Sequence, residues 1–242
     1  MVKLVFLCRR RPDVTHERYA ELLLTGHVPL ALRHHPTMQG YVVNIVDESP
    51  AGAPPLDSVG ELSFASLEEF RERLYDSPAG ERIIARDVAG FMGGADGYAT
   101  TPHVQKVWPG RRVPGTRSPG IKLVCPVIRR ADMTHAAFVA HWLTHHVPLA
   151  LAHHPGLAAY VTNVVDEKLS PTGPDLDGIA ELHFPSAEAL VKGLFDSPAG
   201  ERAIREDMDR FMRVGHAYAY RVGEYVQKIA ALTTGPSRAR GG

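Results

Sequence analysis

Apolar runs typical of strands alternate with amphipathic segments typical of helices along the first half of this chain. Runs rich in branched and aromatic side chains predict strands at residues 2–9, 40–47, 59–64 and 103–108. Thr15, Ser66 and Ser77 are suited to cap helices, and the first of these helices is expected to end near His27. The resulting order of strand, helix, strand, strand, helix, strand predicts an α+β, ferredoxin-like βαββαβ unit with helices on one face of an antiparallel sheet.

The same pattern occurs a second time about 120 residues later. Residues 3–48 and 122–167 align without a gap and are identical at 25 of 46 positions. The block Asp76–Arg82 likewise returns as Asp196–Arg202. Solenoid repeats are about 20–50 residues long, so duplication of one whole domain explains this longer period better.

The duplication divides the chain into two units, residues 1–108 and residues 121–232. Strands of the second unit are expected at residues 121–127, 159–166, 179–184 and 225–229. Residues 109–120 have the proline and glycine content of a linker, and residues 233–242 are expected to form a disordered tail.

Composition narrows the possible partners. The chain has 27 basic and 27 acidic residues, so no net charge favours nucleic acid or an anionic membrane. No apolar run approaches the roughly 20 residues that span a bilayer, and the basic start of the chain lacks a signal-peptide core before Pro12. We therefore expect a cytoplasmic protein, with Cys8 and Cys125 as buried free thiols.

The third strand of each unit predicts where a ligand would bind. Leu62 and Phe64 share the face that would meet the helices, whereas Glu61 and Ser63 point to the other face. The sheet face that no helix covers therefore carries a glutamate, and a face of this kind does not form a purely apolar core. We expect the two units to close these faces on each other within one chain, around a partly polar cavity that binds a small hydrophobic molecule.

Two motifs carry a resemblance to a known family. The segments Arg10–Tyr19 and Gly26–Leu30 combine an Arg-Arg-Pro turn, an aromatic helix residue and His-Val-Pro-Leu. The second unit repeats this pattern, except that Ala131 replaces the proline of the turn. These residues resemble the opening signature of EthD-domain proteins. The resemblance implies a dimeric α+β barrel made of two ferredoxin-like units, here supplied by one polypeptide. The second unit keeps Trp142 where the first has Leu23, so we expect the second unit to hold the better-formed pocket.

Paired histidines are the main candidates for chemistry. His27 and His146 either cap the end of an apolar helix or act as a general acid and base at the cavity mouth, because the pKa of histidine lies nearest neutrality. His34 and His153 precede His-Pro, where they either order a loop or contact a ligand. His183 is a further candidate for ligand binding.

Tyrosines and glutamates complete the candidate site. Tyr41 and Tyr160 begin the second strands, where they either donate hydrogen bonds to a bound carbonyl or phenol or pack in the core. Glu61 and Glu181 would cost several kcal/mol if buried alone, so they are either acid–base groups with a raised pKa or partners of a lysine. By chain position, those lysines are Lys3 and Lys122, and Trp142 is expected to contact a ligand.

No metal or cofactor is expected from the motifs. His141 and His145 have the spacing of a metal-binding pair, but no glutamate or third ligand accompanies them. Glycine-rich phosphate loops, nucleophile elbows and Cys-x-x-Cys pairs are also missing from the sequence. The remaining hypotheses are an enzyme and a binding protein. The enzyme would cyclise, dehydrate or oxygenate an aromatic or polyketide-like molecule, whereas the binding protein would hold such a molecule for a partner oxidoreductase. A homodimer of the two-unit chain is compatible with both.

Overall fold

The computed structural model describes residues 1–229 and confirms two repeated α+β units, so the tail expected at residues 233–242 lies outside the described residues. Unit 1 contains β1 (Val2–Arg10), α1 (His16–Glu21), η1 (Leu22–His27), α2 (Val28–His34), β2 (Gly40–Glu48), β3 (Ser58–Phe64), α3 (Leu67–Arg73), α4 (Pro78–Phe91) and β4 (Met92–Lys106). Unit 2 contains β5 (Ile121–Val127), α5 (His135–His141), η2 (Trp142–His146), α6 (Val147–His153), β6 (Ala159–Lys168), β7 (Gly178–Phe184), α7 (Ala187–Gly193), α8 (Pro198–Phe211), η3 (Val214–His216) and β8 (Tyr220–Lys228).

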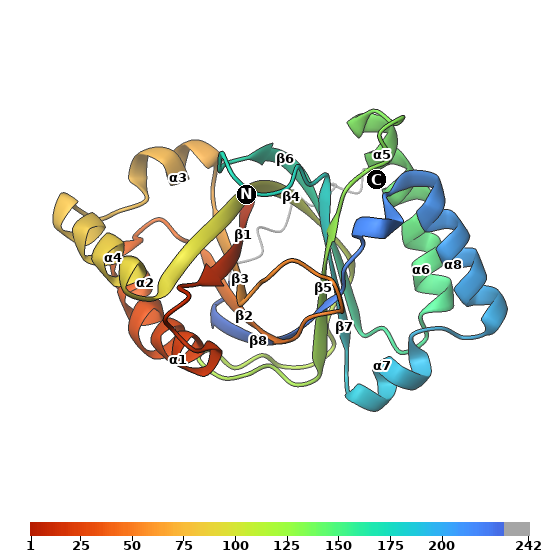
Figure 1. Cartoon of the computed structure of the whole chain (residues 1–242), viewed down its shortest axis with the longest axis horizontal. Coiled ribbons are helices and arrows are strands. Elements are labelled where there is room, and N and C mark those ends of the chain that lie inside the picture. Colours follow the sequence, from red (N-terminus) through yellow and green to blue (C-terminus); the bar gives the residue numbers. More distant parts are fainter. Residues whose placement is uncertain (230–242) are drawn as a thin grey trace, which may run out of the picture.

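The eight strands form one closed barrel in the order β1-β3-β2-β8-β5-β7-β6-β4. Within each unit the strands follow the ferredoxin-like order, and the units join edge to edge where β2 pairs with β8 and β4 pairs with β6. All these pairs are antiparallel, and closure leaves no free sheet edge. The predicted intrachain α+β barrel is therefore confirmed, and Figure 1 shows it between two groups of helices.

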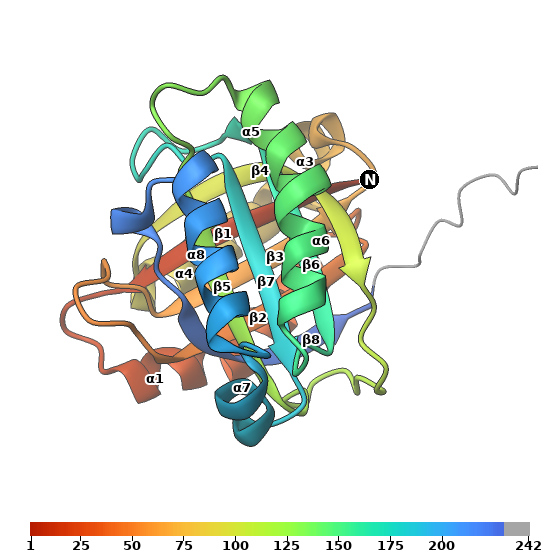
Figure 2. The same ribbon diagram turned by 90° about the vertical axis from the view of Figure 1, so that its right-hand side faces the viewer.

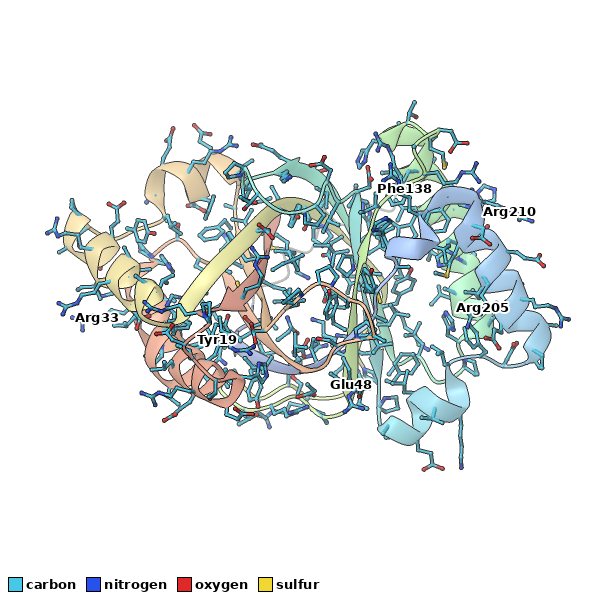
Figure 3. All side chains as sticks on the ribbon, in the orientation of Figure 1. Tyr19, Arg33, Glu48, Phe138, Arg205 and Arg210 are labelled. Atoms are coloured by element: carbon cyan, nitrogen blue, oxygen red, sulfur yellow. The ribbon has the colours of Figure 1, made fainter. Side chains whose placement is uncertain are left out.

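Helices cover the outer face of each half of the barrel. In Figure 2 helices α6 and α8 lie in front of the sheet, one on each side of β7. An apolar cluster packs between helices and sheet in each unit, with Tyr19 and Phe138 at matching positions (Figure 3). The Asp-Ser-Pro block starts the last helix of each unit, because Ser77 and Ser197 accept hydrogen bonds from backbone N–H groups of its first turn.

The barrel interior has an apolar part and a charged part. Along β1, alternate side chains point inward, so Val5 and Leu7 join an apolar cluster while Lys3 enters a group of charged residues. No helix among residues 1–229 is long and apolar enough to cross a membrane.

Two strands differ from their predicted bounds. β4 begins at Met92 rather than near residue 103, and β8 begins at Tyr220 rather than near residue 225. The start of β4 was not predicted because the segment contains several glycines. Glycine is rare in strands, so its presence does not indicate one. In the structure Gly97 is needed there, since a Cβ atom at this position would lie 2.8 Å from the ring of Phe6.

The segment predicted as a linker lies along β8. The backbone N–H groups of Gly115 and Ser118 donate to the carbonyls of Val226 and Glu224 at 2.8 and 2.7 Å. Arg117 also forms a bridge with Tyr225. The connection between the units therefore extends the wall of the barrel.

Candidate functional site

The first helix of each unit contains a π-helical turn, which corrects the prediction that this helix ends near His27. The helix continues to His34 because the wider turn accommodates Pro29, whose missing N–H would interrupt an α-helix. At this turn Val28 N–H donates to the carbonyl of Leu23, five residues earlier. Such insertions are frequent at functional sites. The histidine at the turn therefore points sideways from the middle of a helix and does not cap a helix end.

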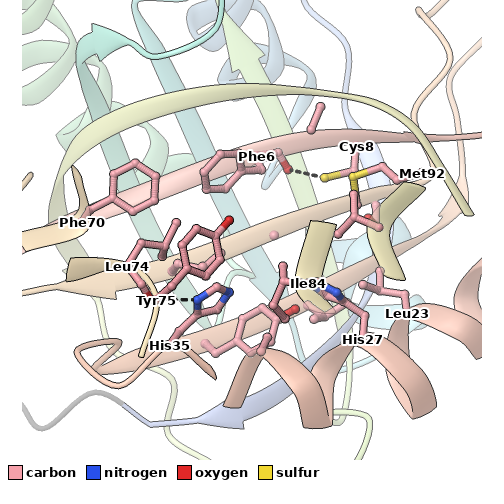
Figure 4. Close-up of a pocket in the computed structure, with 18 residues that line it drawn as sticks. Phe6, Cys8, Leu23, His27, His35, Phe70, Leu74, Tyr75, Ile84 and Met92 are labelled. Atoms are coloured by element: carbon pink, nitrogen blue, oxygen red, sulfur yellow. Dashed lines mark hydrogen bonds between the residues drawn. The ribbon is translucent and has the colours of Figure 1, made fainter. Parts of the chain in front are cut away.

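A cavity of about 330 Å³ lies in unit 1 between the helices and the outer face of the sheet. This position differs from the expected one between the two sheets. Figure 4 shows its wall of apolar and aromatic side chains, which come from β1, the first helix, the α3 region and α4. The polar groups among the lining residues are those of Cys8, His27, His35, Tyr41, Ser58 and Tyr75.

His27 is held in one orientation at the cavity wall. Its Nδ1 lies 2.9 Å from Oδ2 of Asp87 on α4, and its ring packs 5.9 Å from the ring of Phe91. A carboxylate can only accept, so Nδ1 carries the proton and Nε2 of the neutral ring is left with a lone pair. The arrangement provides a fixed proton acceptor beside an apolar cavity.

Tyr41 and His35 are the other polar groups placed at this wall. Burial raises the pKa of Tyr41, so its phenol stays protonated, and no group in residues 1–229 is hydrogen-bonded to its hydroxyl. His35 Nδ1 donates to the carbonyl of Leu74 at 3.0 Å, and burial lowers the pKa of His35. Tyr41 can thus donate a hydrogen bond to a ligand, while His35 is a neutral polar contact.

Unit 2 has a matching but smaller cavity of about 260 Å³. His146, His154 and Tyr160 occupy the positions of the three polar groups just described. The indole of Trp142 also lines this cavity, and its Nε1–H donates to the hydroxyl oxygen of Tyr160 at 3.3 Å. The hydroxyl that is free in unit 1 therefore has a protein partner in unit 2.

The side chain of Trp142 fits only because a neighbouring position also differs between the two units. A Cβ atom at Gly178 would lie 2.1 Å from Cζ3 of the indole, so only glycine leaves room for this ring. Unit 1 has Ser58 at that position, where its Oγ is hydrogen-bonded to the hydroxyl of Tyr19 at 2.7 Å. Three positions thus differ together, namely Tyr19, Leu23 and Ser58 in unit 1 against Phe138, Trp142 and Gly178 in unit 2.

His146 is more tightly held than its counterpart in unit 1. Asp207 accepts from His146 Nδ1 at 3.0 Å with one oxygen and lies 2.9 Å from His141 Nε2 with the other. Burial lowers the pKa of His146 despite this carboxylate. Asp207 therefore binds two histidines, and one of them is His141, a member of the pair with metal-like spacing.

Glu61 and Glu181 lie inside the barrel and line neither helix-side cavity, which corrects the expectation that they belong to the reactive site. The lysines predicted as partners are confirmed, since Lys3 Nζ lies 2.5 Å from both carboxylates, and Lys122 Nζ lies 2.5 and 2.8 Å from them. Burial alone would raise the pKa of Glu181, but the two lysines hold it well below its usual range. Both glutamates therefore stay ionised as parts of an ion-pair cluster.

His183 belongs to the same interior cluster and does not contact either helix-side cavity. Its Nε2 lies 3.5 Å from Oε2 of Glu224, a carboxylate that also approaches Lys122 at 3.2 Å. Burial, followed by the charge of Lys122, lowers the pKa of His183 to about 4. His183 was expected to contact a ligand. In the structure it is a neutral side chain surrounded by charged residues.

His34 and His153 hold loops in place, which agrees with the first of the two alternatives for them and places neither at a helix-side cavity. Their Nδ1 atoms lie 3.0 Å from Asp76 and Asp196. A Cβ atom at Gly80 would lie only 2.8 Å from His34 Nδ1, which explains the glycine in the repeated Asp-Ser-Pro-Ala-Gly block. The neighbouring histidines, His35 and His154, line the cavities instead.

The cysteines are free thiols, as predicted. Burial raises the pKa of Cys8 and of Cys125 to about 12, so both thiols are protonated at neutral pH and are poor nucleophiles. Cys8 is buried, whereas Cys125 is half-buried. Among residues 1–229 no group of three or more His, Cys, Asp or Glu side chains is arranged to hold a metal ion.

Sequence reasoning missed the aspartates that orient the two histidines. Asp87 and Asp207 occupy the same position of the repeated α4 and α8 helices, nine residues after the proline that starts each helix. A carboxylate repeated on the helix face shared with Ile84 and Phe91 was the available signal, because unpaired carboxylates avoid such faces.

Comparisons with known proteins agree with this architecture. The family model of the EthD domain matches the chain twice, at residues 11–95 and 130–214. No curated protein matches the sequence at a significant level. Among solved structures, an anthrone oxidase-like protein has a TM-score of 0.60 and 13% identity, with 95% of each chain covered. A protein of Fusobacterium nucleatum provisionally described as a monooxygenase has a TM-score of 0.55 and 9% identity, covering 96% of this chain and 94% of its own.

Proposed function

This chain belongs to the EthD domain family, with one domain in each half, and from that premise we propose that it is an oxygenase-like enzyme for a small hydrophobic molecule. The observation that carries the proposal is the His27–Asp87 pair at the wall of an apolar cavity of about 330 Å³. Small-molecule pockets are usually about 300–1,000 Å³ and combine an apolar lining with a few polar groups. The names of the two structural neighbours, an oxidase-like protein and a monooxygenase, support the same class of reaction.

The lining of the unit 1 cavity favours an aromatic or polyketide-like substrate. Phe6, Phe70 and Tyr75 contribute rings to the wall, and Phe6 lies 6.4 Å from Phe70 in a tilted arrangement. Flat rings pack well against such walls in offset or edge-to-face geometry. Among residues 1–229 the one charged partner at the wall is the carboxylate behind His27, so a neutral substrate with one acidic O–H or C–H group fits best.

The first chemical step is a proton transfer to His27. Its Nε2 accepts a proton from the substrate, and Asp87 stabilises the imidazolium that forms. Tyr41 donates its O–H to the oxygen on which negative charge develops, because burial keeps this phenol protonated. Cyclisation and dehydration would begin with the same transfer.

Oxygenation then follows if the anion meets dioxygen. For a methylene between two aryl or carbonyl groups the overall reaction is R–CH2–R′ + O2 → R–CO–R′ + H2O. Both hydrogens leave the carbon as protons and four electrons pass to dioxygen. One oxygen atom forms the carbonyl, and the other leaves as water. A delocalised carbanion supplies the electrons itself, so the scheme needs no tightly bound cofactor.

Oxygen uptake tests this proposal. Wild-type protein is mixed with aromatic carbon acids and phenols, anthrone among them, and dioxygen consumption is compared with that in buffer. We expect protein-dependent uptake that falls by about 100-fold or more in His27→Gln, in line with the usual contribution of a general base. Thermal unfolding of the variant is the control for folding. Binding of these compounds without any protein-dependent uptake would instead identify a binding protein that serves a partner oxidoreductase.

A further inference from the structure

The unit 2 cavity has different hydrogen-bonding properties from the unit 1 cavity. An indole N–H can only donate, so the contact from Trp142 Nε1 occupies a lone pair of the Tyr160 oxygen. Burial raises the pKa of Tyr160 and keeps its proton in place. Among residues 1–229 this proton has no acceptor, so the hydroxyl can donate one hydrogen bond to a ligand.

The shape of the unit 2 cavity also differs. Trp142 occupies part of it, and its wall carries the flexible side chain of Met208 in addition to Met212, the counterpart of Met92 in unit 1. Methionine adapts its shape to ligands of varied outline. In unit 1 the position of Met208 is occupied by Val88, and the cavity volume is about 330 Å³ against about 260 Å³ in unit 2.

One wall of the unit 2 cavity is formed by chain that is not part of a strand. Pairing of β5 with β8 stops at Val124 and Tyr220, because the next residues of β5 include Pro126, which has no N–H to donate. The chain before β8 therefore forms a non-strand wall that includes Tyr218. Pro126 and Tyr218 also line a separate cavity of about 160 Å³ at the barrel end.

We infer that the unit 2 cavity is a second ligand site, which binds a compact apolar carbonyl compound such as a ketone through a hydrogen bond from Tyr160. A ketone has acceptors and no acidic O–H, which matches a site whose tyrosine is left with a proton to give. In the scheme proposed for unit 1 the product is a ketone, so the second site fits the product class. Only this last link rests on the proposed function, because ligand binding to unit 2 does not require turnover.

Trp142 provides a direct probe of the second site. The chain contains two tryptophans, and Trp108 lies outside both helix-side cavities, so Trp108→Phe leaves Trp142 as the only indole. The test ligands are 1-indanone and indane, which have nearly the same shape and differ in the carbonyl group. Emission of Trp142 reports where each ligand binds, and titration calorimetry of the full chain gives the affinity.

We expect 1-indanone to quench Trp142 and to bind about tenfold more tightly than indane, as one buried hydrogen bond can provide. Tyr160→Phe should remove that tenfold preference and leave indane affinity within about twofold. The matched variant Tyr41→Phe in unit 1 should leave the Trp142 response to 1-indanone as it is. Equal affinities for the two ligands in the wild-type chain, or an unchanged Trp142 emission at saturating 1-indanone, would overturn the inference. Either result leaves the oxygen-uptake experiment on unit 1 as an independent test.

Discussion

The two cavities of this protein occupy the same place in duplicated units but differ in what they offer a ligand. The unit 1 cavity has a free tyrosine hydroxyl at Tyr41 and a histidine held by a single contact to Asp87. In the unit 2 cavity, Trp142 binds the tyrosine oxygen, and Asp207 contacts two histidines. A few coupled replacements have therefore altered the site of one unit while the scaffold of both units stayed the same.

The asymmetry also reverses an expectation based on sequence. Trp142 was expected to improve the pocket of the second unit, since an aromatic side chain is a good ligand contact. In the structure this indole takes up space itself, and the larger cavity lies in unit 1, where the smaller Leu23 occupies the equivalent position. A bulky aromatic residue at a cavity wall can therefore reduce the room for a ligand.

The largest expected effect concerns the lysines in the barrel. Lys122 is almost fully buried and contacts three carboxylates, whereas the side chain of Lys3 is 12% exposed and contacts two. Removing one partner from a buried ionic cluster leaves uncompensated charge, so Lys122→Met should lower the free energy of unfolding by about 3–5 kcal/mol. Lys3→Met should cost less. Urea unfolding of the two variants measures this, and equal losses would mean that the two units share the charge evenly.

A smaller effect is expected from acid titration of His183. Burial lowers its pKa in the folded chain to about 4, against about 6.5 when unfolded. The unfolded chain therefore binds a proton first as the pH falls, and the free energy of unfolding should decrease between pH 6.5 and pH 4 by about 3 kcal/mol from this group.

The matched replacement tests the sign of this effect. Unit 1 has Ser63 where unit 2 has His183, so His183→Ser introduces a residue the fold already accepts there. Stability curves at several pH values should decline less steeply below pH 6.5 for this variant. An identical decline in both proteins would show that His183 does not become a proton acceptor on unfolding.

A third effect concerns the space around Trp142. Gly178→Ala places a Cβ atom 2.1 Å from the indole, and overpacking of this kind costs about 1–3 kcal/mol. Adding Trp142→Leu, which restores the smaller side chain of unit 1, should recover part of that loss. A double-mutant cycle in thermal or urea unfolding measures the coupling. Additive losses would show that the two positions are independent.

Much of the fold could be predicted from the sequence because the repeat fixes the order of elements and strand patterns fix their faces. The partners Lys3 and Lys122 followed from chain position alone. The π-helical turn could not be foreseen, since Pro29 after an apolar stripe looks like a helix end. The start of β4 was missed because glycine is a weak strand signal, although Gly97 is required beneath Phe6.

The candidate site was only half predictable for a physical reason. Inward-facing Glu61 suggested a cavity between the sheets, but a buried carboxylate is stable only with partners, and the lysines that pair with it fill that space. The cavities instead lie on the helix side, where Tyr41 and His27 line the unit 1 cavity, although a position facing the space between the sheets was expected. Contacts such as His27 with Asp87, 60 residues apart, depend on tertiary packing that no local pattern shows.

The central claim is that chemistry belongs to the unit 1 cavity, and filling each cavity in turn tests it most directly. Gly60 and Ala180 occupy equivalent positions of β3 and β7, and each lines the cavity of its own unit. A Cβ atom at Gly60 would meet only ordinary contacts of 3.8 and 3.9 Å, so Gly60→Leu should place its side chain in the cavity.

The measurement is substrate-dependent oxygen uptake by Gly60→Leu and Ala180→Leu, each checked for folding by thermal unfolding. We expect Gly60→Leu to lower kcat/KM by about 100-fold or more, because displacement of a substrate by about an ångström already has effects of that size. For Ala180→Leu we expect a loss of less than about threefold, which is under 1 kcal/mol. Equal losses in the two variants, or a larger loss in Ala180→Leu, would contradict the assignment of the reaction to unit 1.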